Sequence, residues 1–307
     1  MMSFARPVSF RRGVTLLELL VAISIIAVLT GLSYGGVQRV RGLANYYERV
    51  NWRQQHQLGE VQRRDQPIRM LFVGNSFTFY HDVPGLLTNL AKEAGNKPPI
   101  VAVTAANGGH SLKMNWERPD VQQLVTDAKG DWDFVVLQEM RGLPVARSGP
   151  DGFGFVYGRA EYFVPYAKKF NETARERNAV TMLFMTWKVP AMTSTTQEEW
   201  TDSYLRLAKE IRSECSPVGM AIELAMLRKP GISLFHDQYP GHVNERGSYL
   251  AACTFYAAVF NESPVGLPRQ VAQTNGSTLT VSPTDATLLQ TCAWDAYQQY
   301  KKRLKAP

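Results

Sequence analysis

From residue 66 onward, short apolar runs alternate with longer amphipathic stretches, and this alternation limits the fold more than any other feature. The pattern predicts β-strands separated by α-helices, which is typical of a parallel sheet covered by helices on both faces. The chain contains no internal repeat and no low-complexity tract. The expected strands are Arg69–Val73, Ile100–Thr104, Phe134–Gln138, Val180–Thr186 and Val218–Ile222.

The segments between and after these runs are expected to be helices. A glycine-rich piece, Met140–Arg159, is expected to form a loop, and loops after strand ends often carry substrate contacts. The stretch Gly266–Val281 is expected to be an irregular or hairpin excursion before the last helix. The expected helices are Val83–Ala94, Asp120–Ala128, Tyr162–Arg177, Gln197–Ser213, Val243–Phe260 and Pro283–Leu304.

The first 34 residues combine a basic leader with a long apolar run. Residues 1–13 end in two arginines and a glycine, and the apolar run that follows carries one charge, Glu18, near its start. About 20 apolar residues make a helix of ~30 Å, which is long enough to cross the core of a bilayer. We therefore expect residues 14–34 to form a hydrophobic transmembrane helix, in which Glu18 is costly unless it is paired.

This segment resembles a type IV prepilin leader, because Gly13 closes a short basic leader and Glu18 is the fifth residue after it. The resemblance implies that a prepilin peptidase cuts after Gly13 and that the new N-terminal residue, Val14, is methylated. It also implies that Glu18 pairs with the N-terminal amine of a neighbouring subunit in a pilin-like or pseudopilin-like assembly. A Sec signal peptide and a simple membrane anchor are the alternatives.

The basic leader also predicts on which side of the membrane the body lies. By the positive-inside rule, an arginine-rich leader stays in the cytoplasm. The body then lies outside the inner membrane of a bacterial cell envelope, tethered by a single pass or exported. Residues 35–66 are expected to form an exposed helical stalk or linker, and Pro67 marks the start of a domain that covers residues 67–307.

The positive charge of the chain is concentrated in its N-terminal segment. The total is +7, and residues 1–65 supply +5 of it, from nine arginines against four acidic residues. The remaining residues are nearly neutral as a group. No basic surface for a nucleic acid is therefore expected on the folded body.

The sequence gives no sign of a metal site or another cofactor. The three cysteines, Cys215, Cys253 and Cys292, lack the spacing of metal ligands. They are expected to be buried thiols, with one intramolecular disulfide as the alternative. His236, Asp237 and His242 lie close together in sequence, but no second cluster completes a metal site. We therefore expect the protein to need no cofactor.

Four polar pieces, each just after a predicted strand, contain Ser76, Gly109, Gln138 and His242. A serine becomes a nucleophile when a histidine takes its proton, and an acid such as Asp237 holds the histidine in the right tautomer. Backbone N–H groups and a side-chain amide stabilise the charge that develops on the carbonyl oxygen. The pattern predicts acyl transfer, with Ser76, Gly109 and Gln138 as oxyanion-hole donors.

These pieces resemble the blocks of the SGNH/GDSL hydrolase superfamily, and the resemblance covers residues 68–305. Gly74-Asn75-Ser76-Phe77-Thr78 is similar to the first block of one subgroup, in which glutamine, here Gln138, replaces the usual asparagine of the third block. The resemblance implies a three-layer α/β/α, flavodoxin-like fold with a five-stranded parallel sheet, preceded here by the N-terminal hydrophobic helix. It also implies metal-free hydrolysis of carboxylic esters, often O-acetyl groups on carbohydrate.

One position departs from this family. The family places its aspartate three residues before the catalytic histidine, where this chain has Tyr239, and Asp237 stands five residues before His242. The dipeptide Pro240-Gly241 permits a tight bend that brings Asp237 to His242. Otherwise the chain works as a Ser–His dyad.

Two further residues are expected near the substrate. His110 is either a substrate contact or a satisfied loop residue. Trp187, after the fourth predicted strand, is either a pocket wall for the face of a sugar or ordinary packing. Glu139 is expected to be structural rather than to orient Gln138.

The sequence therefore predicts a serine esterase that is tethered or exported through a prepilin-like helix. The main rival is a minor pilin or pseudopilin whose globular part is structural. A pilin body normally shows antiparallel strands packed on the long N-terminal helix, whereas this body alternates strands and helices. A third interpretation is an α/β domain that has lost its activity and only binds carbohydrate.

Overall fold

The computed structural model describes residues 67–306, except residues 96, 128–130, 141–148, 151–155, 158–159, 190–194 and 240. The chain divides into two compact units, Met1–Arg49 and Val50–Pro307, and all described residues belong to the second unit. The expected leader, hydrophobic helix and stalk, with Gly13, Val14 and Glu18, lie outside the described residues. Within the described part of the chain, no helix combines the length and the apolar character needed to cross a membrane.

The domain is built on a five-stranded sheet in the order β2-β1-β3-β6-β7, in which every neighbouring pair is parallel. This order is the flavodoxin-like one, in which the chain first winds to one side of β1 and then to the other. The five-stranded parallel sheet with helices on both faces is confirmed. The strands are β1 (Ile68–Gly74), β2 (Ile100–Ala106), β3 (Phe134–Leu137), β6 (Val180–Phe184) and β7 (Glu214–Ser216).

The fifth strand is not where the sequence predicted it. Residues Val218–Ile222 begin a helix, α8 (Val218–Arg228), and the edge strand β7 is the short piece before it. A short apolar run fits a buried helix as well as a buried strand, so periodicity alone cannot separate them. The run continues for 11 residues rich in Ala, Met and Leu, which favour a helix.

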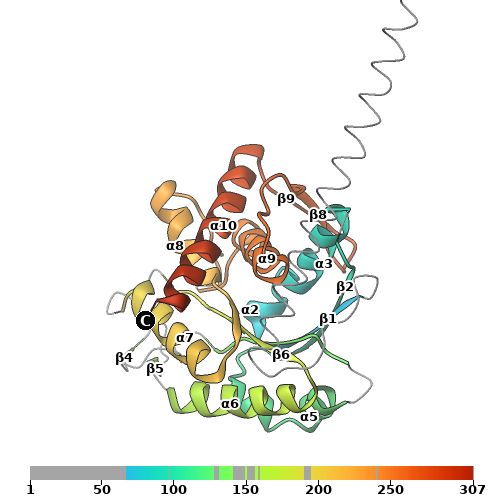
Figure 1. The fold of residues 1–307 in the computed structure, drawn as a ribbon. Coiled ribbons are helices and arrows are strands. Elements are labelled where there is room, and N and C mark those ends of the chain that lie inside the picture. The colour runs from blue at the N-terminus through green and yellow to red at the C-terminus, as the bar shows by residue number, and fades with distance from the viewer. Residues whose placement is uncertain are drawn as a thin grey trace, which may run out of the picture. The chain divides into compact units, whose positions relative to one another are not determined.

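Helices cover both faces of the sheet (Figure 1). On one face, α3 (Val83–Glu93) packs against α9 (Glu245–Phe260), and α10 (Pro283–Lys305) packs on α9 and α8. On the other face lie α5 (Pro119–Thr126) and α6 (Ala160–Glu176), below the sheet in Figure 1. The helix α7 (Gln197–Ile211) contacts α8 and α6. The six helices expected from the sequence are therefore confirmed, with ends that differ by a few residues.

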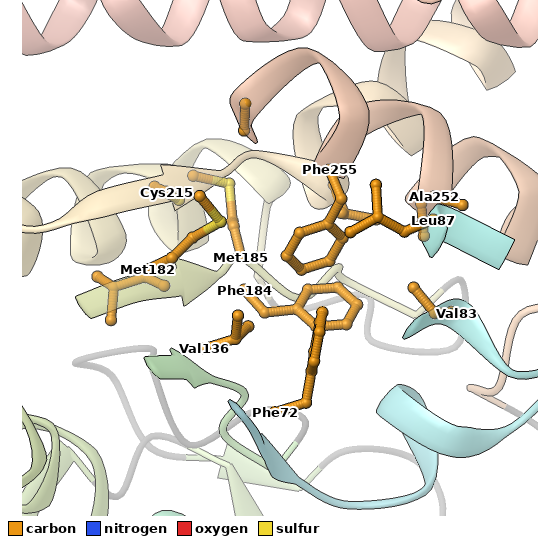
Figure 2. Close-up of a cluster of buried hydrophobic side chains, with 14 of the residues drawn as sticks. Phe72, Val83, Leu87, Val136, Met182, Phe184, Met185, Cys215, Ala252 and Phe255 are labelled. Atoms are coloured by element: carbon orange, nitrogen blue, oxygen red, sulfur yellow. The ribbon is translucent and has the colours of Figure 1, made fainter. Parts of the chain in front are cut away.

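Three phenylalanine rings meet within the hydrophobic core between the sheet and α9 (Figure 2). Phe255 of α9 meets the ring of Phe72 from β1 at 5.5 Å and the ring of Phe184 from β6 at 4.8 Å, both near edge-on. All three side chains are fully buried. Burying one such side chain stabilises the fold by roughly 1.5–3 kcal/mol. This cluster fixes α9, and therefore the turn that precedes it, on the carboxyl half of the sheet.

Two small antiparallel sheets lie outside the central one. The expected excursion before α10 is a hairpin of β8 (Gln270–Ala272) and β9 (Thr278–Thr280). Within the segment expected to be a loop, β4 (Gly149–Pro150) pairs with β5 (Val156–Tyr157). The β8–β9 hairpin is attached to the turn before α3, because Thr274 donates to Asp82 Oδ2 through its N–H and its hydroxyl, at 2.8 Å each.

Candidate active site

Ser76 and His242, which the sequence predicted as nucleophile and base, lie together. Ser76 begins α2 (Ser76–Phe79), two residues after β1 ends, and His242 lies in the turn before α9. The Nε2 atom of His242 is 2.8 Å from Ser76 Oγ, although 166 residues separate the two in the chain. Both residues are partly exposed. This arrangement lets the imidazole accept the proton of the hydroxyl.

Ser76 is held in place by a close contact between the ends of β1 and β3. Gln138 Oε1 accepts hydrogen bonds from the N–H of Asn75 at 2.8 Å and from the hydroxyl of Thr78 at 3.0 Å. A Cβ on Gly74 would lie 2.6 Å from Gln138 Oε1 and 2.5 Å from Thr78 Oγ1. A side chain at this position would force these groups apart, so glycine allows the close approach where the chain leaves β1 for α2.

Gln138 itself is fully buried. Its amide nitrogen donates to the backbone oxygen of Glu139, while its oxygen accepts the two bonds from the serine turn. In this structure the side chain of Gln138 therefore supports the turn that carries Ser76. Its expected role as an oxyanion-hole donor stays a prediction.

The glycine block forms a turn after β2. The N–H of His110 donates to Asn107 O at 3.2 Å, and Gly109 has a φ of +72°, in the left-handed region that favours glycine. Asn75 Nδ2 donates to His110 O at 2.9 Å, so the serine turn and the glycine turn are joined directly. Gly109 is exposed and His110 is half-buried. The N–H of Gly109 as an oxyanion donor, and His110 as a substrate contact, stay predictions.

Glu139 joins the end of β3 to the helix after the glycine turn, α4 (Leu112–Trp116). Its two carboxyl oxygens lie 3.1 and 3.2 Å from the donating N–H of Leu112, and Oε1 accepts from the N–H of Met140 at 2.6 Å. The residue is fully buried. Burial raises the pKa of this carboxyl well above its usual range, against the opposing effect of the backbone hydrogen bonds.

His242 lies in a narrow turn whose backbone is bonded on both sides. Phe235 and Val243 form an antiparallel bridge at its base. The N–H of His236 donates to His242 O at 2.9 Å, and the N–H of His242 donates to Tyr239 O at 3.0 Å. These bonds fix the backbone of His242 before α9 begins.

Trp187 supports the same turn from inside the domain. Its indole N–H donates to Gly241 O at 3.0 Å, and its ring stacks on Phe77 at 4.6 Å with 19° between the planes. Phe77 in turn meets the ring of His242 edge-on at 5.2 Å. Trp187 is fully buried and offers no exposed face to a sugar in this structure. Its expected role in substrate binding stays a prediction.

Asp237 lies in the turn that carries His242, at an exposed position. Tyr239 occupies the position three residues before His242, and its side chain is 52% exposed. The turn thus presents an aromatic ring where the family pattern has its acid. Both the triad that includes Asp237 and the Ser–His dyad stay predictions.

Sequence reasoning did not single out two tyrosines beside His242 as site residues. The ring centroid of Tyr80 lies 5.1 Å from that of His242, and the ring of Tyr239 lies 5.9 Å from Tyr80. The available signal for Tyr80 was its place four residues after Ser76, one helical turn away. A helix of four residues is too short to show a periodic pattern in the sequence, so this spacing does not mark Tyr80 as a site residue.

The three cysteines and the possible metal ligands do not form a second site in the described part of the chain. Cys215, Cys253 and Cys292 are free and buried, as the sequence favoured, and burial raises the pKa of each thiol. A buried thiol of raised pKa is a poor nucleophile. Among the residues that the structure describes, no group of three or more His, Cys, Asp or Glu side chains is arranged to hold a metal ion.

Comparison with known families matches one segment of the chain. Residues 9–34 match the prokaryotic N-terminal methylation motif. The segment therefore carries the type of motif that the Gly13 and Glu18 pattern predicted. No curated protein sequence matches the chain.

Comparison with solved structures matches the α/β domain. A DUF4886 family protein from Bacteroides uniformis is 20% identical, with a TM-score of 0.53, over 76% of this chain and 95% of that one. An acetyl xylan esterase is 15% identical, with a TM-score of 0.47, over 62% and 100%. A mutant of an acetylxylan esterase from Geobacillus stearothermophilus is also 15% identical, with a TM-score of 0.47, over 64% and 96%. The likeness to the Bacteroides uniformis protein concerns the fold alone.

Proposed function

We propose that the domain of residues 67–307 is a serine esterase of the SGNH type. The observation that carries this proposal is the 2.8 Å distance between His242 Nε2 and Ser76 Oγ. It is supported by the place of Ser76 at the carboxyl end of β1, beside the switch point between β1 and β3 where flavodoxin-like sheets bind their ligands.

In the proposed reaction, Ser76 Oγ attacks the carbonyl carbon of an ester while His242 Nε2 takes the hydroxyl proton. The tetrahedral intermediate collapses, the alcohol leaves with the proton held by His242, and the acyl group stays on Ser76. A water molecule then gives a proton to His242 and attacks the acyl-enzyme. The carboxylic acid leaves and Ser76 regains its proton.

The oxyanion formed in each half-reaction needs fixed donors. The proposed donors are the N–H of Ser76, the N–H of Gly109 and the amide of Gln138. One of the two N–H groups of the buried Gln138 amide donates to Glu139 O, and the other is the proposed oxyanion donor. Loss of one oxyanion donor typically lowers the rate by ~100- to 1,000-fold.

The acid of the site has two proposed forms. In one, Asp237 closes toward His242 and orients the imidazole; in the other, the pair works as a dyad. The variant Asp237→Asn separates them. A loss of about 10,000-fold in kcat assigns the acid to Asp237, as expected when a triad carboxylate is neutralised. Retention of most of the activity assigns the dyad.

The N-terminal motif supports an envelope protein that is secreted or membrane-anchored. We propose that a prepilin peptidase cuts after Gly13, that Val14 is methylated, and that residues 14–34 tether or export the domain outside the inner membrane. Mass spectrometry of the N-terminal peptide from the native host tests this. A peptide that begins at methylated Val14 is expected, and a peptide that retains residues 1–13 in the mature protein contradicts it.

The same motif favours one other function, that of a minor pilin or pseudopilin with a structural body. In that case Glu18 pairs with the amine of a neighbouring subunit in an assembly. The two functions are compatible, because an esterase domain can be displayed on a pilin-like helix. The substrate class, an ester of a saccharide such as an O-acetyl group, rests on the family resemblance of Ser76, Gly109 and His242 alone.

The proposed function is tested on the full chain with a panel of aryl acetates, short-chain esters and acetylated glycosides. The variants Ser76→Ala and His242→Ala are measured beside it, with Ser263→Ala, an exposed serine after α9, as the matched control. Turnover and fluorophosphonate labelling are expected in the wild type and in the control, and both are expected to vanish in Ser76→Ala. A folded wild-type chain with neither turnover nor labelling contradicts the esterase.

A further inference from the structure

A group of rings lies beside the Ser76–His242 pair and is not used in the chemistry. Tyr80 lies 5.1 Å from His242, Tyr239 lies 5.9 Å from Tyr80 and 6.4 Å from His242, and His236 lies 4.8 Å from Tyr239, each measured between ring centroids. We propose that Tyr80 and Tyr239 form the subsite that binds the alcohol part of the ester, and that this part carries a sugar ring. The inference rests on the proposed function.

The two tyrosines are held through their backbones, and neither residue is fully buried. Tyr239 is 52% exposed, yet its N–H donates to His236 Nδ1 at 3.3 Å and its carbonyl accepts from the N–H of His242. Tyr80 is half-buried, and its N–H donates to Ser76 O at 2.8 Å. Each tyrosine is therefore bonded through its backbone to one member of the reacting pair. These bonds hold the two backbones, and in this structure both rings lie beside His242.

The place of these rings around the histidine indicates which part of the substrate they touch. His242 takes the proton of Ser76 and then has to deliver it to the oxygen of the departing alcohol. That oxygen must therefore lie within hydrogen-bond reach of His242 Nε2. Groups that surround His242 thus face the alcohol part of the ester. Rings at 5.1 and 6.4 Å from the imidazole are near enough to contact what is attached to that oxygen.

The two tyrosines favour a substrate ring that has both an apolar face and polar hydroxyl groups. Aromatic side chains offer an apolar face with a negative quadrupole, on which the C–H face of a pyranose ring can stack. Each tyrosine also carries a hydroxyl that can donate to or accept from a sugar hydroxyl. The alcohol part of a short aliphatic ester has no ring face to stack on the tyrosines, so the subsite does not improve its binding.

The test compares two esters of one acyl group on the full chain. Vinyl acetate has no ring in its alcohol part, and a peracetylated methyl glycoside has one. In Tyr239→Ala we expect kcat/KM for the glycoside to fall by roughly 10-fold, mostly through KM, because a ring contact supplies about 2- to 10-fold. We expect kcat/KM for vinyl acetate to fall by clearly less than kcat/KM for the glycoside, because vinyl acetate has no ring to contact Tyr239. Leu227→Ala, an exposed apolar residue of α8, is the matched control and should change neither substrate.

Equal losses on both esters, or no loss on the glycoside, overturn the subsite while leaving the esterase intact. If the wild-type chain turns over neither ester, the proposed function fails, and calorimetry with Ser76→Ala decides the subsite separately. Binding of the acetylated glycoside to Ser76→Ala that is weakened by roughly 10-fold in Ser76→Ala/Tyr239→Ala supports the subsite. Absent binding, or equal binding by the two variants, overturns it.

Discussion

Trp187 donates its indole N–H to the backbone oxygen of Gly241 at 3.0 Å, so a residue that follows β6 holds the residue before His242. In Trp187→Phe this bond is lost, while a ring remains to stack on Phe77. We expect kcat to fall by about 10-fold with little change in KM, because the imidazole is less well placed to take the proton. Steady-state kinetics on an aryl acetate measure both constants.

Trp132→Phe is the matched control for this prediction. Trp132 Nε1 also donates to a backbone oxygen, that of Leu124 at 2.8 Å, and its side chain is buried. Both variants should lose about 0.5–1.5 kcal/mol of unfolding free energy. Only Trp187→Phe should lose kcat. Similar losses of kcat in the two variants would show that the effect is one of general stability.

Gly74→Ala is expected to destabilise the domain and to lower its activity. The new Cβ would lie within 2.6 Å of Gln138 Oε1 and 2.5 Å of Thr78 Oγ1, so the bonds that hold the serine turn have to shift. Overpacking of this kind typically costs about 1–3 kcal/mol. Urea denaturation measures the cost. Gly108→Ala, at a glycine with open space around its Cβ direction, should leave the unfolding free energy within about 0.5 kcal/mol.

Asn75→Asp is expected to separate the serine turn from the glycine turn. Asn75 Nδ2 donates to His110 O at 2.9 Å, and a carboxylate oxygen in its place would face that carbonyl without a hydrogen between them. The side chain is buried, so we expect a loss of roughly 1–3 kcal/mol in unfolding free energy and a lower kcat. Asn89→Asp removes a similar bond, to Ala272 O at 2.7 Å, on the exposed side of α3. A loss of stability as large as that of Asn75→Asp in this control would contradict the prediction.

Glu139→Gln is expected to change the pH dependence of stability. Burial raises the pKa of Glu139 in the folded chain above its usual value near 4.5, so the folded state binds this proton more tightly than the unfolded state. The contribution to stability is complete below the unfolded pKa and is lost as the pH rises through the folded pKa. Stability of the wild type should therefore fall with rising pH in this range.

The glutamine variant has no proton to lose and keeps one acceptor oxygen for Leu112 and Met140. Its unfolding free energy relative to wild type should therefore improve as the pH rises. Urea denaturation at a series of pH values measures this, with Glu172→Gln, exposed on α6, as the matched substitution. Parallel curves for wild type and Glu139→Gln would show that the folded pKa is not raised.

The arrangement of strands and helices followed from the sequence because each long element has its own periodicity. The error at Val218–Ile222 arose where an apolar run is too short to distinguish a strand from a buried helix. The strand that replaced it, β7, has only three residues and no apolar run to mark it. The short helices α2 and α4 were not predicted, because they are also too short to show a periodic pattern.

The place of Ser76 was predictable because parallel strands put their carboxyl ends at one edge of the sheet, and Ser76 follows β1. His242 lies in the turn before α9 and follows helix α8 rather than a strand, so its place beside Ser76 was expected only from the family resemblance. The directions of the side chains around them were not predictable. Gln138 was expected to donate to an oxyanion, and Trp187 was expected either to line a pocket or to pack in the core. In this structure both side chains are fully buried, and Gln138 Nε2 and Trp187 Nε1 donate to backbone oxygens. Such directions depend on packing between segments far apart in the chain, which a local pattern does not contain.

The hydrogen bond between Ser76 and His242 joins two segments that are 166 residues apart. Contacts of this kind form late in folding, because closing a long loop costs conformational entropy before the contact can stabilise the fold. A polypeptide made from its N-terminus therefore exposes the serine turn well before the histidine exists. In the finished domain, α9, which follows His242, packs on α3 and on the sheet. A chain cut short before residue 242 therefore holds Ser76 without the histidine that lies 2.8 Å from its hydroxyl in the finished domain.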